Sequence, residues 1–230
     1  MTPPLFSKVL IANRGEVALR TVRALADLGI ASLAVYAEDD AQAPQVHAAD
    51  SAVALGATGP AAYLDGVRLL AIAREHGCDA LHPGYGFLSE RADFAAACAE
   101  AGVRFIGPTP AQLALFGDKA QARALAQRCG VPLMPGTEHA VTLAEAEAFW
   151  QQHATAGIVI KAIGGGGGRG MRAVQAGDDL TAAYARCRSE AQAAFGVDGV
   201  YVERLMAHAR HIEIQVLGDG QDVLALGERE

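Results

Sequence analysis

The sequence has few cysteines, few aromatic residues and no excess of positive charge. Its 230 residues include 4 cysteines and 6% aromatic residues, and 19 basic against 26 acidic residues give a formal net charge of -7. A chain of this charge has no general attraction to polyphosphate, which argues against a nucleic-acid partner. The cysteines are widely spaced without a C-x-x-C pair, so we expect buried or incidental thiols rather than a zinc knuckle or a disulfide framework.

Long apolar runs are also missing. No run approaches the ~18 to 20 residues that span a bilayer, and the amino-terminal segment lacks the basic-then-apolar layout of a signal peptide. We therefore expect no membrane partner and a cytoplasmic location. With 51% hydrophobic residues the chain can bury a sizeable core, which excludes intrinsic disorder, and its length allows one or two domains.

Strand and helix signals alternate in the first half of the chain. Apolar runs predict strands at 8–12, 30–36, 80–82 and 103–106, and helical spacing predicts helices at 15–28, 61–75 and 92–101. This alternation indicates a parallel sheet with helices on both faces and ligands beyond the carboxyl ends of the strands. The turn at 12–18 has one glycine where a dinucleotide fingerprint has three, which disfavours an NAD-dependent dehydrogenase.

A lysine stands at the expected start of a helix in the second half. Asp118 and Gln121 have the spacing of a capping box, which places Lys119 at the first helical position. A cation there opposes the helix dipole, so its presence makes more sense if the lysine and the exposed backbone amides together bind an anion. The alternative for Lys119 is a solvated surface lysine.

Further along, proline and capping signals punctuate the chain. The segment 131–136 carries two prolines and a glycine and is a candidate domain boundary. Thr142 and Glu145 form a second capping box, which predicts a helix that ends at about His153.

Five consecutive glycines, Gly164 to Gly168, are the strongest local signal. They follow a β-branched strand at 158–160 and Lys161, and they precede an apolar stretch at 171–174. Glycines are costly to order, but a phosphate chain can offset that cost because backbone amides approach its oxygens closely and the lysine adds charge. Since the lysine precedes the glycines, the pattern is not a Walker A loop, and we expect a hairpin lid over phosphates. A flexible linker is the alternative.

Six segments in order resemble the biotin carboxylase family of ATP-grasp ligases. They are 11–20 (IANRGEVALR), 82–90 (HPGYGFLSE), 105–108 (FIGP), 117–119 (GDK), 160–172 (IKAIGGGGGRGMR) and 211–216 (HIEIQV). The resemblance covers essentially the whole chain. It implies an enzyme that uses ATP with Mg (or Mn) to phosphorylate bicarbonate and then transfers the carboxyl group to biotin on a carrier protein.

The resemblance also assigns nucleotide contacts to nine residues. These are Lys119 and Lys161 at the ATP phosphates, Gly167 and Gly168 in the backbone that covers the phosphates, Glu203, Arg204, Leu205 and Met206 in the linker that holds adenine, and His211 beside the nucleotide. A zinc site at His208 and His211 is disfavoured because no third ligand of suitable type accompanies them.

The implied fold is α/β in two parts. Residues 1–117 correspond to a parallel-sheet pre-ATP-grasp domain, and 118–230 to the first part of an ATP-grasp domain with an α+β lid at about 132–205. In the family, the metal-binding carboxylates, the catalytic base and the arginine that steadies biotin follow the segment that ends at Glu230. We therefore expect the carboxy-terminal part of the ATP-grasp fold to be missing, with no catalytic or metal residue present and no turnover by this chain alone.

Partners and alternatives follow from the same resemblance. It implies a biotin carboxyl carrier protein or domain, a carboxyltransferase subunit or domain, and the homodimer usual in the family. The final acceptor, whether acetyl-CoA, propionyl-CoA, another acyl-CoA, pyruvate or urea, is chosen by the carboxyltransferase. Two alternatives stay open: a non-catalytic nucleotide-binding or regulatory module, and another bicarbonate-activating ATP-grasp ligase such as a carbamoyl phosphate synthase. Segment 82–90 and the glycine block weigh against the latter.

Overall fold

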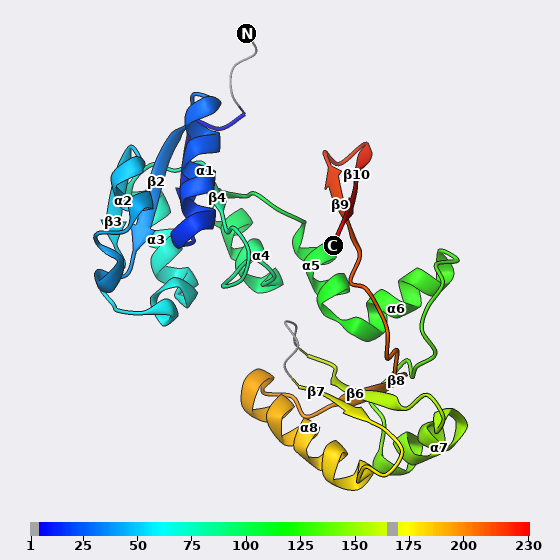
Figure 1. The fold of residues 1–230 in the computed structure, drawn as a ribbon. Helices are drawn as coiled ribbons and strands as arrows, with labels where there is room; N and C mark the ends of the chain where they lie inside the picture. Colours follow the sequence, from blue (N-terminus) through cyan, green and yellow to red (C-terminus); the bar gives the residue numbers. More distant parts are fainter. Residues whose placement is uncertain (1–4, 165–169) are drawn as a thin grey trace. The chain divides into compact units, whose positions relative to one another are not determined.

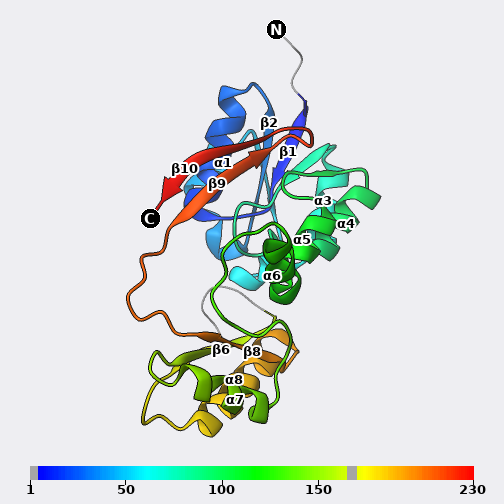
Figure 2. The same cartoon turned by 90° about the vertical axis from the view of Figure 1, so that its right-hand side faces the viewer.

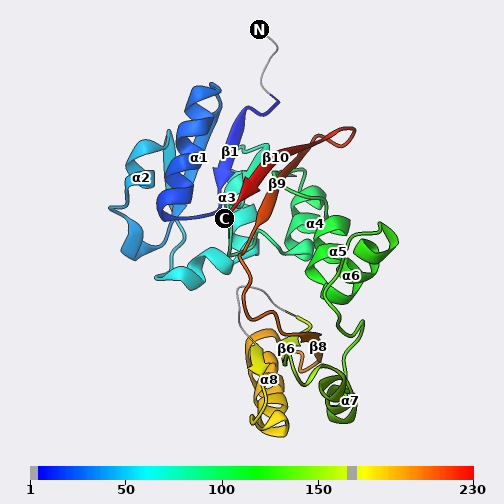
Figure 3. The same cartoon turned by 45° about the vertical axis from the view of Figure 1, so that its right-hand side comes forward.

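The chain divides into two compact units, Met1–Asp118 and Lys119–Glu230, in the computed structural model. The structure describes residues 5–164 and 170–230. Figure 1 colours the chain from blue at the amino terminus to red at the carboxyl terminus, and Figures 2 and 3 show the same elements from two further directions.

A five-stranded parallel sheet forms the centre of the first unit. In spatial order its strands are β3 (Ser51–Ala54), β2 (Ala31–Tyr36), β1 (Lys8–Ile11), β4 (Ala80–His82) and β5 (Arg104–Phe105). The strand order reverses between β1 and β4, and ligands bind open α/β sheets beyond the carboxyl ends of strands at such a switch point. The predicted parallel sheet is confirmed, with β3 as a strand that the apolar runs do not indicate.

Helices cover both faces of this sheet. They are α1 (Gly15–Asp27), α2 (Pro44–Ala48), α3 (Gly66–Glu75), α4 (Ala92–Glu100) and α5 (Pro110–Gly117), with 3-10 helices at Glu38–Asp40 and Pro60–Leu64. Successive strand residues point to opposite faces. Val9 and Ile11 accordingly pack in one buried cluster with Val22 of α1, whereas Leu10 packs in another with Leu69 of α3.

The helices differ from expectation at two places. The predicted helix 61–75 is divided into a 3-10 helix and α3, because Asp65 leaves the helical conformation and its side chain caps α3. Helix α5 is absent from the expected elements although its signals are present: Thr109 and Gln112 form a capping box, and Pro110 occupies the first helical turn.

The second unit contains a three-stranded antiparallel sheet and a separate two-stranded hairpin. Its elements are α6 (Lys119–Arg128), α7 (Leu143–His153), β6 (Ile158–Ala162), β7 (Met171–Val174), α8 (Leu180–Phe195), β8 (Val200–Arg204), β9 (Glu213–Gly218) and β10 (Val223–Arg229). Strand β6 lies between β7 and β8, and β9 pairs with β10. Helices α7 and α8 lie on the same side of the three-stranded sheet (Figures 1 and 2). The helix predicted from the capping box at Thr142 is confirmed as α7.

Alternation along β6 gives the antiparallel sheet a core face and a second face. Ile158 and Ile160 are buried in a cluster with Tyr184 and Cys187 of α8. The prediction that the strand ends at 160 is wrong, because β6 continues to Ala162. Lys161 therefore lies inside the strand, on the face away from α8.

The β9–β10 hairpin exposes apolar side chains. They are Ile214, Val216, Leu217, Val223, Leu224 and Leu226, each at least 50% exposed. Strand β10 begins with the apolar residues of 223–226 and continues to Arg229. Figure 3 shows the two strands side by side in red and orange. A two-stranded ribbon of this kind has little stability by itself.

Two properties expected from composition can be compared with the structure. No helix in the ranges 5–164 and 170–230 is long and apolar enough to cross a membrane. Cys78, Cys98 and Cys187 are buried free thiols, and Cys129 is exposed. Burial raises the pKa of Cys98 and Cys187 to about 11, so these thiols are protonated at neutral pH.

Candidate functional site

Three charged side chains meet on the face of the second sheet away from α8. Lys161 of β6 forms an ion pair through Nζ with Oε2 of Glu203, and Arg123 of α6 donates from Nη1 to Oε1 of the same carboxylate at 2.7 Å. The side chains of Glu203, Arg123 and Lys161 are 12%, 14% and 25% exposed. We call these three residues the Lys161 cluster.

Strand register brings the lysine and the glutamate together. In the antiparallel pair of β6 and β8, Lys161 is opposite Tyr201 and Val159 is opposite Glu203. Diagonal neighbours on one face of a sheet are within reach of long side chains. The pairing of two strands that start 42 residues apart in sequence therefore creates the ion pair.

Two backbone features hold the arginine and the glutamate close to each other. Arg123 Nη2 donates to the carbonyl of Met134 at 2.8 Å, which fixes the plane of the guanidinium. A Cβ at Gly136 would lie 2.8 Å from Glu203 Cγ and 3.1 Å from Arg123 Nη2. The absence of a side chain at Gly136 thus leaves the room that the ion pair occupies.

The Lys161 cluster has one more positive than negative charge. Its two cations share the carboxylate of Glu203, and the neighbouring Tyr201 is neutral at neutral pH because burial raises its pKa well above the usual value. Surplus positive charge in a partly dehydrated setting favours an anionic ligand. This arrangement can bind a phosphate group.

The other residues assigned to phosphates lie at or near the same elements. Lys119 is half-buried and begins α6, one turn before Arg123, so both side chains project from the same side of the helix. Gly167 and Gly168 lie outside the described residues. Strands β6 and β7, which flank the glycine run, pair antiparallel as the hairpin prediction requires.

The segment assigned to adenine leaves the end of β8. Glu203 and Arg204 are its last strand residues, followed by the half-buried Leu205 and by Met206, which is 52% exposed. The N–H of Arg204 donates to the Pro135 carbonyl at 2.8 Å, and that of Leu205 to the Gly157 carbonyl at 2.9 Å. Both donors are thus used within the protein, so neither is available to a base. His211 is exposed in the chain between β8 and β9.

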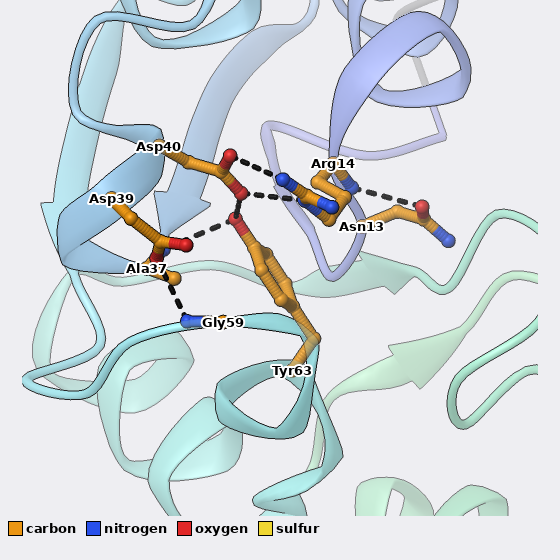
Figure 4. Close-up of polar contacts among 7 residues, drawn as sticks. All are labelled: Asn13, Arg14, Ala37, Asp39, Asp40, Gly59 and Tyr63. Carbon is orange, nitrogen blue, oxygen red and sulfur yellow. Dashed lines mark hydrogen bonds and ion pairs between the residues drawn. The ribbon is translucent and has the colours of Figure 1, made fainter.

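In the first unit, the buried Asn13 joins the carboxyl ends of β1 and β4. Its Nδ2 donates to the carbonyls of Pro83 and Tyr85 at 2.7 and 2.9 Å, and its Oδ1 accepts the N–H of Arg14 at 2.9 Å. Figure 4 shows the last of these bonds. The side chain therefore ties the loop after β4 to the loop after β1 at the switch point.

The loop after β4 has an unusual backbone conformation close to the residues that Asn13 holds. Gly84 and Gly86 have φ values of 65° and 68°, and Phe87 has a φ of 44°, which is rare outside glycine. A Cβ at Gly84 would lie 2.5 Å from Asn13 Nδ2. The loop presents Tyr85, which is 70% exposed. Strain of this kind concentrates at functional sites, and this loop is part of segment 82–90.

A second polar group supports the loop after β1. Arg14 pairs with both oxygens of Asp40, and its Nε lies 2.6 Å from Oδ2. The Tyr63 hydroxyl donates to Asp40 Oδ2 at 2.8 Å and accepts the N–H of Ala37 at 3.1 Å (Figure 4). The hydrogen bonds from Arg14 lower the pKa of Asp40 below its usual value. Burial opposes this shift, and the hydrogen bond from Tyr63 adds to it. Burial raises the pKa of Tyr63 to about 12.

Acidification is expected to remove the stabilisation that Asp40 provides. Because its pKa in the folded state is below the unfolded value of about 3.9, this stabilisation is complete above that pH and is lost as the pH falls through the folded pKa. We expect Asp40→Asn to lower the free energy of unfolding by about 2 kcal/mol at pH 7, with a smaller difference at pH 3. Denaturant titrations followed by circular dichroism would measure both values.

The control is Asp93→Asn, which should have little effect because Asp93 belongs to an ion pair whose side chains are 59% and 66% exposed. Equal losses for Asp40→Asn at both pH values would contradict this account.

Comparison with known proteins adds two family matches. Residues 5–113 match the biotin carboxylase N-terminal domain, and residues 118–230 match the ATP binding domain of the carbamoyl-phosphate synthase L chain. The chain is 48% identical over 227 residues to the mitochondrial pyruvate carboxylase of Rattus norvegicus, covering 97% of this chain and 19% of that protein. It is 44% identical over 227 residues to the biotin carboxylase of Nostoc sp., covering 98% of this chain and 51% of that protein.

Solved structures agree with the sequence matches. The biotin carboxylase domain dimer of Hydrogenobacter thermophilus 2-oxoglutarate carboxylase, in complex with MgADP, ADP and bicarbonate, is 40% identical with a TM-score of 0.93 over 98% of this chain and 50% of that chain. Biotin carboxylase from Campylobacter jejuni, in a β-γ-ATP complex, is 40% identical with a TM-score of 0.92, over 97% and 50% of the two chains. The chain therefore spans about half of the biotin carboxylases and about a fifth of the pyruvate carboxylases that it matches.

Proposed function

Since this chain belongs to the biotin carboxylase family of ATP-grasp ligases, we propose that it forms the amino-terminal, ATP-binding part of an enzyme that carboxylates biotin. In this reaction MgATP phosphorylates bicarbonate, and the carboxyl group then passes to biotin on a carrier protein, with release of ADP and phosphate. Relatives with the names pyruvate carboxylase and biotin carboxylase, and related structures that contain MgADP and bicarbonate, support this proposal.

The observation that carries the proposal is the surplus positive charge of the Lys161 cluster. Enzymes that transfer phosphoryl groups act mainly by positioning and by neutralising phosphate charge, so a partly buried cation beside a glycine run fits a nucleotide. We assign Lys161, Lys119 and the backbone of Gly167 and Gly168 to the phosphates. We assign the segment from Glu203 through Arg204 and Leu205 to Met206 to adenine, and His211 to the neighbourhood of the nucleotide. Because the N–H groups of Arg204 and Leu205 are engaged, Met206 would supply the main-chain donor to the base among the three residues that follow Glu203.

We base the assignment of the magnesium site on the family resemblance. Within residues 5–164 and 170–230, no group of three or more His, Cys, Asp or Glu side chains could hold a metal ion. From the resemblance, we assign the magnesium carboxylates, the base that deprotonates bicarbonate and the arginine that steadies biotin to the half of the biotin carboxylases that this chain does not span. The chain alone is then expected to bind ATP without turnover.

The domain organisation and the partners belong to the same proposal. We assign 1–117 to a pre-ATP-grasp domain and 118–230 to the first part of an ATP-grasp domain, with 132–205 as its lid. A biotin carrier, a carboxyltransferase and a second copy of the enzyme are its proposed partners. A cytoplasmic location stays a prediction, because relatives include mitochondrial pyruvate carboxylases.

A carbamoyl phosphate synthase is the second candidate, because residues 118–230 match a domain family named after that enzyme. The rat pyruvate carboxylase and the Nostoc biotin carboxylase, however, match 97% and 98% of this chain at 48% and 44% identity, this segment included. Residues 5–113 match the amino-terminal domain of biotin carboxylase. A biotin enzyme is therefore the better candidate.

Bicarbonate-dependent ATP hydrolysis, measured with and without free biotin, tests the proposal. For an enzyme that includes the remainder of the ATP-grasp domain, we expect hydrolysis to require bicarbonate and to rise with biotin. The 230-residue chain should bind ATP but hydrolyse it at background rate. Clear turnover by the 230 residues would contradict the assignment of the catalytic residues to the part of the enzyme that this chain does not span. If biotin does not change the rate of ATP hydrolysis by the longer enzyme, the result would favour a carbamoyl phosphate synthase. Nucleotide binding by the longer enzyme without hydrolysis would favour a regulatory module.

A further inference from the structure

We propose that Arg123 is a positioning residue that holds the carboxylate of Glu203, so that Lys161 is free to leave this carboxylate for the phosphates of a nucleotide. The inference rests on the proposed ATP-binding function. It assigns a role to a residue on α6 that neither the sequence motifs nor the family resemblance singles out.

The geometry divides one carboxylate between two cations. Arg123 Nη1 donates to Oε1 of Glu203, whereas Lys161 Nζ pairs with Oε2. Arg123 Nη2 is held in addition by the carbonyl of Met134. When Lys161 turns away, Glu203 therefore keeps an ion pair on its other oxygen, made by a group whose orientation is fixed independently of the lysine.

Burial makes this second partner necessary. The Glu203 side chain is 12% exposed, so water cannot readily replace a lost cation beside it. A buried charge that loses its only partner is strongly destabilised. Without Arg123, Lys161 would be the remaining partner of Glu203 among the three residues of the cluster, and phosphate would have to compete with Glu203 for it.

Arginine suits this task better than lysine does. A guanidinium stays protonated and presents donors in a rigid fork, which here serves the Glu203 carboxylate and the Met134 carbonyl together. Its Nε is buried without a hydrogen-bond partner among the described residues. Buried ion pairs contribute little net stability compared with apolar packing, so an incompletely satisfied arginine at this position points to a role in placing Glu203.

ADP affinity, measured by titration calorimetry on the complete enzyme, separates this role from a structural one. We expect R123M to weaken ADP binding about tenfold and R123K by a smaller factor. In the E203Q background, which has no carboxylate to hold Lys161, R123M should change ADP affinity by less than about twofold. R188M is the control, because it removes an arginine of the same unit from an exposed ion pair with Asp198, and it should bind ADP as the unsubstituted enzyme does.

Each outcome decides one of the two proposals. R123M with unchanged affinity would overturn the role of Arg123, and so would an equal loss in the Glu203 and E203Q backgrounds. If R123M does not fold, the ADP affinity of R123K is compared in the Glu203 and E203Q backgrounds instead. By contrast, an unsubstituted enzyme that does not bind ADP, or a K161M variant with unchanged affinity, would contradict the proposed function itself.

Discussion

Replacing Lys161 with methionine is expected to weaken ATP binding by about 10- to 100-fold, because a hydrogen bond between charged groups contributes about 1.5 to 3 kcal/mol. The melting temperature should change little. Methionine retains an apolar stem, and Arg123 still pairs with Glu203 when the lysine is removed. The KM for ATP of the complete enzyme, and thermal unfolding of the same preparation, measure the two effects.

The control for this substitution is Lys8→Met, which makes the same change on β1 of the first unit. It should leave the KM for ATP unchanged. If Lys161→Met instead unfolds the protein while ATP affinity per folded molecule stays normal, Lys161 is a structural residue and the phosphate assignment is wrong.

Replacing Gly157 with alanine is expected to destabilise the second unit by about 3 kcal/mol, the largest loss of stability among the changes considered. Gly157 has a φ of +82°, and its Cβ would lie 2.8 Å from the carbonyl oxygen of Val174 and 3.2 Å from Leu205 Cδ2. Val174 is completely buried, so this carbonyl has little room to move. Trp150, the single tryptophan, packs against the core of the same unit and reports its unfolding by fluorescence in denaturant.

Gly196→Ala separates the clash from the backbone strain. Gly196 also has a positive φ, +72°, but no atom lies within 4 Å of its added Cβ. It should cost about 1 kcal/mol, the ordinary penalty of alanine in a left-handed conformation. Equal losses at the two glycines would show that the contact with Val174 contributes nothing.

Local sequence signals predict much of the first sheet. The apolar runs locate β1, β2, β4 and β5 within two residues at each end, because side chains buried on both sides of a parallel sheet must be apolar. In the predicted helix 61–75, the helical spacing of apolar residues continues through Asp65. The sequence therefore does not show that one helix ends and another begins there. Only the cap geometry of α3 separates them.

Long-range pairing explains what the sequence does not predict at the candidate site. The glycine run next to Lys161 draws attention to this lysine in the sequence. By contrast, the helical segment that contains Arg123 gives no indication that this arginine pairs with Glu203, 80 residues away. Asn13 is likewise an ordinary polar residue until β1 and β4 are paired. Composition does hold one signal: the chain has three lysines against sixteen arginines, and two of the three are Lys119 and Lys161. Because lysine offers a compact, movable charge, its use at Lys119 and Lys161 suits the phosphate contacts proposed for these two positions.

The β9–β10 hairpin has a consequence for the behaviour of the chain in solution. Within residues 5–164 and 170–230, no further strand pairs with either edge of this two-stranded sheet. Apolar side chains such as Ile214 and Leu217 point to opposite faces of the ribbon. Open edges with apolar faces are templates for further strands. Whenever no neighbour covers it, this hairpin is therefore a site at which strands of other chains can add, so we expect the solubility of the protein to fall when the hairpin is uncovered.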